Sequence, residues 1–210
     1  PYTYSKKEFV VESDWSAASY YYSIVALSGV KTTLQINGLF QKSLQADSVC
    51  AEIYKNFGVT TSYSENEITI TKSAVVSKSQ LDYNFIECPD IAQTVVCTSV
   101  GLQIPFKFTG LQTLKVKETD RIIALKNEFL KFGIELIVSD NSIQWLGENS
   151  LNKSITVSIA TYNDHRMAMS FATLSVLLNE VIIEDANVVS KSYPLFWEHL
   201  KSIGINQAPI

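Results

Sequence analysis

The fold is decided by a segment that occurs three times, as VVESDWSAAS (residues 10–19), FIECPDIAQT (85–94) and IATYNDHRMA (159–168). In each copy an aspartate stands between a β-rich run and an apolar helical run, and the three aspartates are Asp14, Asp90 and Asp164, at spacings of 76 and 74 residues. A fixed period of this length indicates structural repeats. We therefore expect three units, at about 1–75, 76–150 and 151–210.

Hydrophobic periodicity predicts the same order in each unit: strand, helix, strand, helix and a closing β-hairpin. The expected elements of the first unit are 8–12, 15–28, 32–37, 46–57 and two strands around 64–66. Those of the second unit are 83–87, 91–100, 105–109, 118–132, 135–138 and 142–146. The third unit begins at residue 155 and ends after a helix at 193–203, with a glycine behind the last helix of every unit, at 58, 133 and 204. Such βαβαββ units predict a mixed α/β (α+β) domain with helices around a shared interior.

Composition excludes several classes of protein. The 210 residues include 17 basic and 21 acidic side chains, and the net charge of −4 argues against a nucleic-acid-binding surface. No apolar run reaches about 18 residues and no signal sequence is visible, so we expect no membrane partner and a cytoplasmic location. Cys50, Cys88 and Cys97 match neither a disulfide framework nor zinc-ligand spacing, which indicates a reducing compartment and no metal.

Several basic side chains lie at the N-terminal ends of predicted helices, where a positive charge is unfavourable. The two arginines, Arg121 and Arg166, fall in the first turn of an expected helix, and Lys117, Lys191 and His165 lie beside helix starts. A cation there faces the positive end of the helix dipole and costs about 0.3–1 kcal/mol unless a negative charge is near. We therefore expect a bound anion, held by these cations and by free backbone N–H groups. Solvated surface lysines and a capped or core His165 remain the alternative.

Carboxylates accompany these cations. Lys117, Glu118 and Arg121 have the spacing of one helical face, so Glu118 is either an acid/base beside the anion or a surface ion pair. Asp14 and Asp164 are expected to cap helices. Asp90 follows Pro89, and we expect it to face Glu118 across a pocket as the second carboxylate of an acid/base pair.

These motifs resemble one enzyme family, the 5-enolpyruvylshikimate-3-phosphate synthases (3-phosphoshikimate 1-carboxyvinyltransferases). The resemblance runs through essentially the whole chain and rests on SDWSAASY (13–20), PD (89–90), KETDR (117–121), YNDHRMAM (162–169) and KSYP (191–194). It implies an inside-out α/β barrel domain of three βαβαββ units. It also implies transfer of the enolpyruvyl group of phosphoenolpyruvate to the 5-hydroxyl of shikimate 3-phosphate, without a metal or an organic cofactor.

The resemblance also implies roles for particular residues. Arg121, Arg166 and Lys191 would hold phosphoenolpyruvate, with His165 in support. Asp90 would take the proton of the hydroxyl group, and Glu118 would exchange a proton with the methylene carbon. Shikimate 3-phosphate would contact Asp90, Lys117 and Thr113, although the family often has asparagine at the position of Thr113.

The family combines two such domains, with the active site in the cleft between them. The chain, residues 1–210, is therefore expected to be a single C-terminal domain that lacks its N-terminal partner, inactive alone and monomeric. The sister UDP-N-acetylglucosamine enolpyruvyl transferase is a second interpretation, which the KETDR sequence disfavours. A non-catalytic repeat module that binds an anionic partner is a third.

Overall fold

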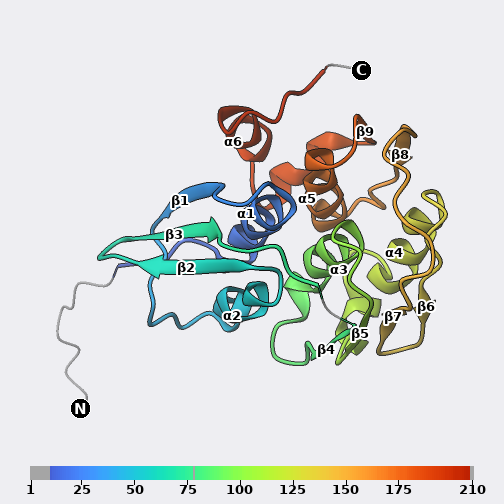
Figure 1. Cartoon of the computed structure of the whole chain (residues 1–210), viewed down its shortest axis with the longest axis horizontal. Coiled ribbons are helices and arrows are strands. Elements are labelled where there is room, and N and C mark those ends of the chain that lie inside the picture. The colour runs from blue at the N-terminus through green and yellow to red at the C-terminus, as the bar shows by residue number, and fades with distance from the viewer. Residues whose placement is uncertain (1–9, 78, 209–210) are drawn as a thin grey trace, which may run out of the picture.

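The computed structural model describes residues 10–77 and 79–208 (Figure 1). The first unit contains α1 (Trp15–Leu27), β1 (Thr33–Asn37), η1 (Ala46–Val49), α2 (Cys50–Lys55), β2 (Val59–Tyr63) and β3 (Glu67–Lys72). The second contains β4 (Leu81–Asn84), η2 (Pro89–Ile91), α3 (Ala92–Gly101), β5 (Phe106–Thr109), η3 (Gln112–Val116), α4 (Arg121–Leu130), β6 (Ile137–Val138) and β7 (Ile143–Trp145). The third contains β8 (Val157–Ile159), α5 (His165–Ala172), η4 (Thr173–Val176), β9 (Val181–Ile183), η5 (Ala186–Lys191) and α6 (Phe196–Ser202).

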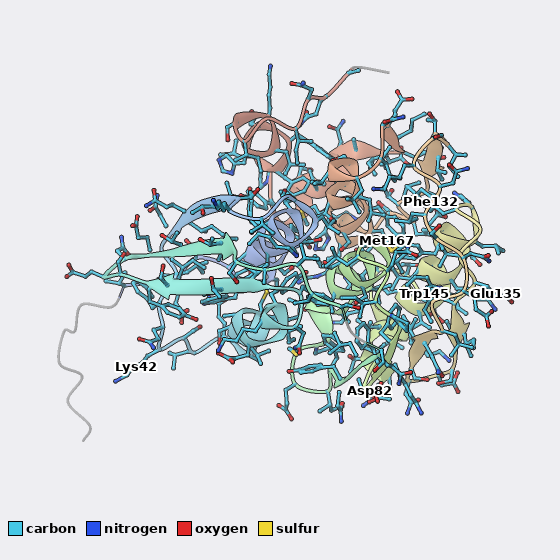
Figure 2. All side chains as sticks on the ribbon, viewed as in Figure 1. Lys42, Asp82, Phe132, Glu135, Trp145 and Met167 are labelled. Carbon is cyan, nitrogen blue, oxygen red and sulfur yellow. The ribbon has the colours of Figure 1, made fainter. Side chains whose placement is uncertain are left out.

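The first helix of each unit lies in the interior. Helices α1, α3 and α5 pack side by side, and the sheets lie around them (Figure 1). Almost every residue of these helices is buried, as expected for helices that are enclosed on all sides. Figure 2 shows Met167 of α5 in the interior and the charged Lys42, Asp82 and Glu135 at the periphery. The α/β class is confirmed, as is the inside-out architecture that the family resemblance implied. The expectation from the sequence pattern that helices lie around a shared interior is wrong for α1, α3 and α5, which form that interior.

Hydroxyl groups join the three central helices at matching positions. Thr94 of α3 lies 3.2 Å from Ser19 of α1 and 3.2 Å from Ser170 of α5, measured between the side-chain oxygens. One turn further along, Ser23 of α1 bonds to Thr98 at 2.8 Å and to Thr173 at 3.0 Å. Partners in these contacts are separated by 75, 76 or 150 residues, so the sequence period is also a spatial period. Each buried hydroxyl thereby gains a partner.

Among the residues that the structure describes, each unit contributes one sheet, but the three sheets differ in their number of strands and in strand direction. The first has the order β1-β3-β2 and is antiparallel, and the second has the order β4-β5-β7-β6 with β4 and β5 parallel. The third consists of β8 and β9, which pair in parallel. Glycines 58, 133 and 204 follow α2, α4 and α6 with φ angles of 74°, 76° and 92°, as helix-ending glycines require.

Several expected boundaries are wrong. Residues 10–12 are not in a strand, and the remainder of the expected strand 8–12 lies outside the described residues. The strand expected at 83–87 is β4, Leu81–Asn84, because the Asn84 side chain accepts the backbone N–H of Ile86 and turns the chain. The helix expected at 193–203 starts at Phe196, since a residue before a proline, here Tyr193, disfavours helical geometry.

The helix expected at 118–132 is α4, which begins at Arg121. The Asp120 side chain accepts the backbone N–H groups of Ile122 and Ile123, both at 3.1 Å, and so caps the helix. Lys117 and Glu118 therefore precede the helix, and the single helical face expected for Lys117, Glu118 and Arg121 does not exist.

Candidate active site

Arg121 is the centre of a group of charged side chains. Its side chain is 2% exposed, and the guanidinium donates to Asp164 Oδ2 at 2.6 Å, Glu118 Oε2 at 2.7 Å and Asp90 Oδ1 at 3.1 Å. A buried guanidinium without such partners would be strongly destabilising. We call Asp90, Lys117, Glu118, Arg121, Asp164 and Arg166 the ion-pair cluster.

Asp164 connects the start of α4 to the start of α5. Its side chain is fully buried, and Oδ1 accepts the backbone N–H of Arg166 at 2.8 Å, which confirms the expected N-cap. The other oxygen accepts from Arg121 Nε. The cap is predictable from the local sequence, whereas this second role is not, because the contact joins residues 43 positions apart.

Asp90 is shared by three cations. One carboxylate oxygen lies 3.3 Å from Lys117 Nζ and 3.1 Å from Arg121 Nη1, and the other lies 3.2 Å from Arg166 Nη2. Burial raises the pKa of Asp90, but Arg166, Lys117 and Arg121 outweigh burial and leave the pKa below its ordinary value. Asp90 is therefore an ionised carboxylate at neutral pH. It lies in η2, at the entry to α3, as the sequence pattern indicated.

Glu118 and His165 face one another without a hydrogen bond. Glu118 Oε1 is 3.6 Å from His165 Nδ1, and this buried nitrogen has no hydrogen-bond partner among the described residues. Burial and the neighbouring Arg166 lower the pKa of His165, so the imidazole is neutral at pH 7. Burial raises the pKa of Glu118, but a backbone N–H and the guanidinium groups of Arg121 and Arg166 together leave it below its ordinary value.

Lys191 is not at the start of a helix, where the sequence pattern predicted it. It is the last residue of η5, an exposed position, and not the start of α6. Its Nζ donates to the Asn163 carbonyl oxygen at 2.8 Å and to Asn163 Oδ1 at 3.2 Å. Since Asn163 directly precedes Asp164, the amine still reaches the edge of the ion-pair cluster.

Thr113 is not joined to the cluster by its side chain in the described part of the chain. It is an exposed residue of η3, which packs against η2, the element that carries Asp90. Its expected contact to substrate therefore stays a prediction.

Negative charge for the helix-start cations comes from within the protein. Arg121, Arg166 and Lys117 face Asp90, Glu118 and Asp164, so formal charges in the cluster balance. The cations therefore need no external anion for charge neutrality. An entering anion would instead compete with these carboxylates for the same N–H donors.

Residues of the first unit also surround Arg166, and sequence analysis missed them. Tyr20 of α1 is buried against Arg166, and burial raises the pKa of its phenol to about 12, although Arg166 opposes this. Asp47 of η1 accepts a hydrogen bond from the Ser16 hydroxyl, and burial raises its pKa. No local pattern marks these residues, because they reach the cluster only through the packing of α1 and η1 against the other units.

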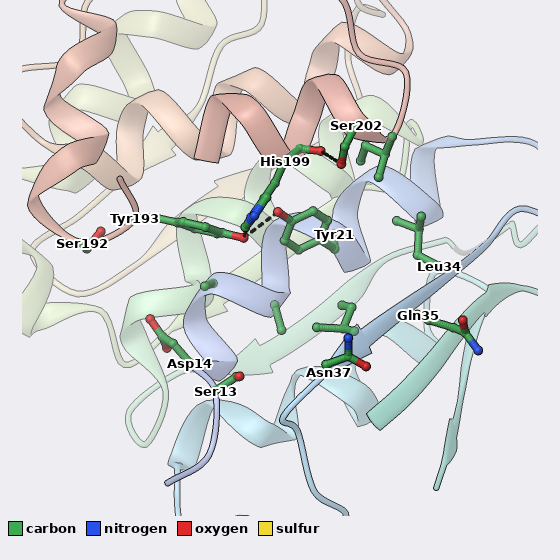
Figure 3. A pocket seen from close by; sticks show the side chains of 14 residues that line it. Ser13, Asp14, Tyr21, Leu34, Gln35, Asn37, Ser192, Tyr193, His199 and Ser202 are labelled. Carbon is green, nitrogen blue, oxygen red and sulfur yellow. Dashed lines mark hydrogen bonds between the residues drawn. The ribbon is translucent and has the colours of Figure 1, made fainter. Parts of the chain in front are cut away.

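A separate hollow of about 540 Å³ lies between α1, β1 and α6 (Figure 3). Its lining includes Asp14, Tyr21, Tyr193 and His199, and among residues 10–77 and 79–208 no lysine or arginine lines it. Tyr193 Oη lies 2.7 Å from Tyr21 Oη and 2.8 Å from His199 Nδ1. A hollow without cations does not match an anionic ligand, so the ion-pair cluster remains the candidate site.

In residues 10–77 and 79–208, no three or more His, Cys, Asp or Glu side chains are grouped as metal ligands would be. Within the same ranges, the helices are all too short or too polar to cross a bilayer.

Solved structures identify the class of fold. An EPSP synthase from Acinetobacter baumannii superposes with a TM-score of 0.74 at 20% identity, over 93% of this chain and 46% of that chain. The enolpyruvyl transferase NikO from Streptomyces tendae superposes with a TM-score of 0.66 at 12% identity, over 92% of this chain and 43% of that chain. The protein therefore has the fold of one half of an enolpyruvyl transferase.

Sequence comparison identifies the family. The model of the EPSP synthase (3-phosphoshikimate 1-carboxyvinyltransferase) family matches residues 1–200, so the chain belongs to that family. A 3-phosphoshikimate 1-carboxyvinyltransferase of Bacteroides fragilis is 46% identical over 205 residues, which are 97% of this chain and 49% of the relative. One of Methanospirillum hungatei is 34% identical over 203 residues, 97% of this chain and 46% of the relative. The chain thus spans about half the length of the curated relatives it matches.

Proposed function

We propose that the chain supplies one half of an active site that transfers the enolpyruvyl group of phosphoenolpyruvate to the 5-hydroxyl of shikimate 3-phosphate, with release of phosphate. This is the reaction of chorismate and aromatic amino acid biosynthesis. The observation that supports it best is Asp90, an ionised carboxylate in contact with Lys117, Arg121 and Arg166. A proton acceptor surrounded by anion-binding groups is what an attack by a hydroxyl group on a phosphorylated substrate needs.

The substrates would take over part of the present ion pairs. The phosphate and carboxylate of phosphoenolpyruvate would bind to Arg121, Arg166 and Lys191, while Lys117 and Thr113 would contact shikimate 3-phosphate. Guanidinium groups suit this task because their N–H donors form paired bonds to planar or tetrahedral oxyanions. His165, neutral and unpaired at Nδ1, would support the site beside Glu118.

The two carboxylates would then move protons. Asp90 would accept the proton of the attacking hydroxyl group, and Glu118 would deliver a proton to the methylene carbon, which gives a tetrahedral adduct. Transfer of a methyl proton back to Glu118, with departure of phosphate that takes up the proton held by Asp90, would give the product and restore both carboxyl groups. Glu118 must be protonated at the outset, and the negative charge of bound substrates would raise its pKa from the low value of the ligand-free site.

The other half of the active site would come from a second domain, N-terminal to the domain formed by residues 1–210. Because half of the substrate ligands would be missing, we expect the 210-residue chain alone to bind phosphate or phosphoenolpyruvate weakly and to be inactive. We further propose a cytoplasmic location and a monomeric enzyme. No cofactor takes part in this proposal.

A chimera tests the proposal. The half of the Bacteroides fragilis relative that this chain does not match is fused to the chain, and phosphate release from phosphoenolpyruvate and shikimate 3-phosphate is measured. We expect turnover by the chimera, none by the chain alone, and a loss of several orders of magnitude in Asp90→Ala. A folded chimera without turnover, or an Asp90→Ala chimera of full activity, would contradict the proposal. Replacing shikimate 3-phosphate by UDP-N-acetylglucosamine tests the sister activity.

A further inference from the structure

Glu128 is a fully buried carboxylate that the proposed chemistry does not use. It lies on α4, seven residues after Arg121, and therefore on the same face of the helix. Its carboxylate accepts three hydrogen bonds, from Lys131 Nζ at 2.6 Å, the backbone N–H of Ala160 at 3.0 Å and the Tyr162 hydroxyl at 2.8 Å. Glu128 thus ties α4 to the segment that leads into α5.

That segment has an unusual backbone. Tyr162 and Asn163 have φ angles of 54° and 58°, so two consecutive residues other than glycine lie in the left-handed region. Asparagine tolerates this region, whereas a bulky residue such as tyrosine adopts it only when its surroundings hold it there. The Asp164 N–H donates to the Thr161 carbonyl oxygen at 2.9 Å, and the Tyr162 hydroxyl is fixed by Glu128.

The strained turn presents the groups that organise the candidate site. Its Asn163 carbonyl oxygen receives the Lys191 amine, and the next residue, Asp164, holds both Arg121 and the first turn of α5. A change in the φ angles at 162 and 163 would therefore move Lys191, Arg121 and Arg166 relative to one another.

We propose that Glu128 and Tyr162 are positioning residues, whose hydrogen bond holds this left-handed turn and with it the spacing of the phosphoenolpyruvate-binding cations. The inference rests on the proposed function and adds two residues to its site. Lys131 and Ala160 already join Glu128 to the end of β8, since Lys131 Nζ also donates to the Ser158 carbonyl oxygen at 2.9 Å. The Tyr162 hydroxyl bond is thus the part of the network that acts on the turn.

The substitution Tyr162→Phe removes that bond and keeps the ring. We expect the dissociation constant of phosphoenolpyruvate for the 210-residue chain to rise roughly 10-fold, the lower end of the effect of losing a hydrogen bond to a charged group. In the chimera, KM for phosphoenolpyruvate should rise while KM for shikimate 3-phosphate stays unchanged, a split that general destabilisation would not produce. Tyr63→Phe, on a half-buried tyrosine of β2 in the first unit, is the matched control and should change neither constant.

Glu128→Gln is the second variant and removes the charge with little change in volume. It should also weaken phosphoenolpyruvate binding. Urea unfolding of both variants is measured first, and phosphoenolpyruvate titrations are carried out at urea concentrations well below the unfolding midpoints, where both variants are folded. Wild-type affinity in both variants, or equal rises in KM for both substrates, would overturn the inference and leave the proposed function standing. If neither the wild-type chain nor the chimera binds phosphoenolpyruvate, the proposed function fails, and the positioning role fails with it.

Discussion

Arg121 Nε and Asp164 Oδ2 are 2.6 Å apart, with side chains that are 2% and 0% exposed. Each residue begins or caps a different helix, so this one ion pair fixes the start of α4 against the start of α5. Because the pair is buried, removal of either charge leaves the other without a counterion in a medium of low polarity. The site and the stability of the domain are therefore coupled at this contact.

Asp164→Asn should be strongly destabilising. The asparagine can still cap α5, but it no longer compensates the buried guanidinium, and we expect a loss of about 3–5 kcal/mol in the free energy of unfolding. Urea unfolding measures this value. Asp14→Asn is the control, because Asp14 caps α1 with a 2.8 Å bond and makes no ion pair with an arginine among the described residues. Losses of equal size in the two variants would show that Asp164 acts only as a cap.

Asp90→Asn should bind anions more tightly although it removes the proposed base. The change frees N–H donors of Lys117, Arg121 and Arg166 and adds one positive unit to the net charge of the site. Phosphate titration of the 210-residue chain, followed by NMR, should show a dissociation constant lower by roughly a factor of ten, about 1.4 kcal/mol. Asp82→Asn makes the same charge change on an exposed residue of β4 and should leave the constant unaltered. Weaker phosphate binding in Asp90→Asn would refute competition between this carboxylate and the ligand.

Acid should destabilise the domain in two stages. The folded state holds the pKa of His165 below 6.5, so the unfolded state binds more protons as pH falls through that value, and stability declines. Asp90 and Glu118 have lowered pKa values, so their contribution, present above about 4.5, is lost at still lower pH.

His165→Gln should remove the first stage and keep the second, as followed by urea unfolding midpoints between pH 7.5 and pH 4. His199→Gln, on the exposed histidine of α6, is the control for the substitution itself. An unchanged decline between pH 7 and pH 5 in His165→Gln would assign that stage to other groups.

The hydroxyl contacts between the central helices should contribute to stability. Thr98 Oγ1 contacts Ser23 Oγ at 2.8 Å and Tyr54 Oη at 2.9 Å, and Thr98→Val leaves both without this partner. The expected loss is about 1–3 kcal/mol in the free energy of unfolding, the usual effect of unsatisfied buried polar groups. Thr60→Val, on an exposed face of β2, should change stability by less than about 0.5 kcal/mol. A Thr98→Val protein as stable as the wild type would contradict this account.

Local boundaries depended on single side chains that the hydrophobic pattern does not register. The predicted helix 118–132 included Glu118, but the Asp120 cap starts α4 at Arg121. Lys191 was expected at a helix start, and Tyr193 before Pro194 delays that helix to Phe196. The Asp120 side-chain cap in the first case, and the steric effect of Pro194 on Tyr193 in the second, outweighed the periodicity of the sequence.

The sequence by itself determined the three repeats, the apolar helices that open them and the family, because period, apolar runs and contiguous motifs can be read along the chain. Asp14 and Asp164 as caps, and the presence of Arg121 and Arg166 in first turns, follow from the same local rules. Tertiary structure alone decided the charge partners. Asp90 and Arg121 come from the second unit and Asp164 and Arg166 from the third, and only the packing of α3, α4 and α5 brings their charges within hydrogen-bonding distance. Because this packing also removes most of these side chains from water, their mutual attraction is stronger than it would be in solvent.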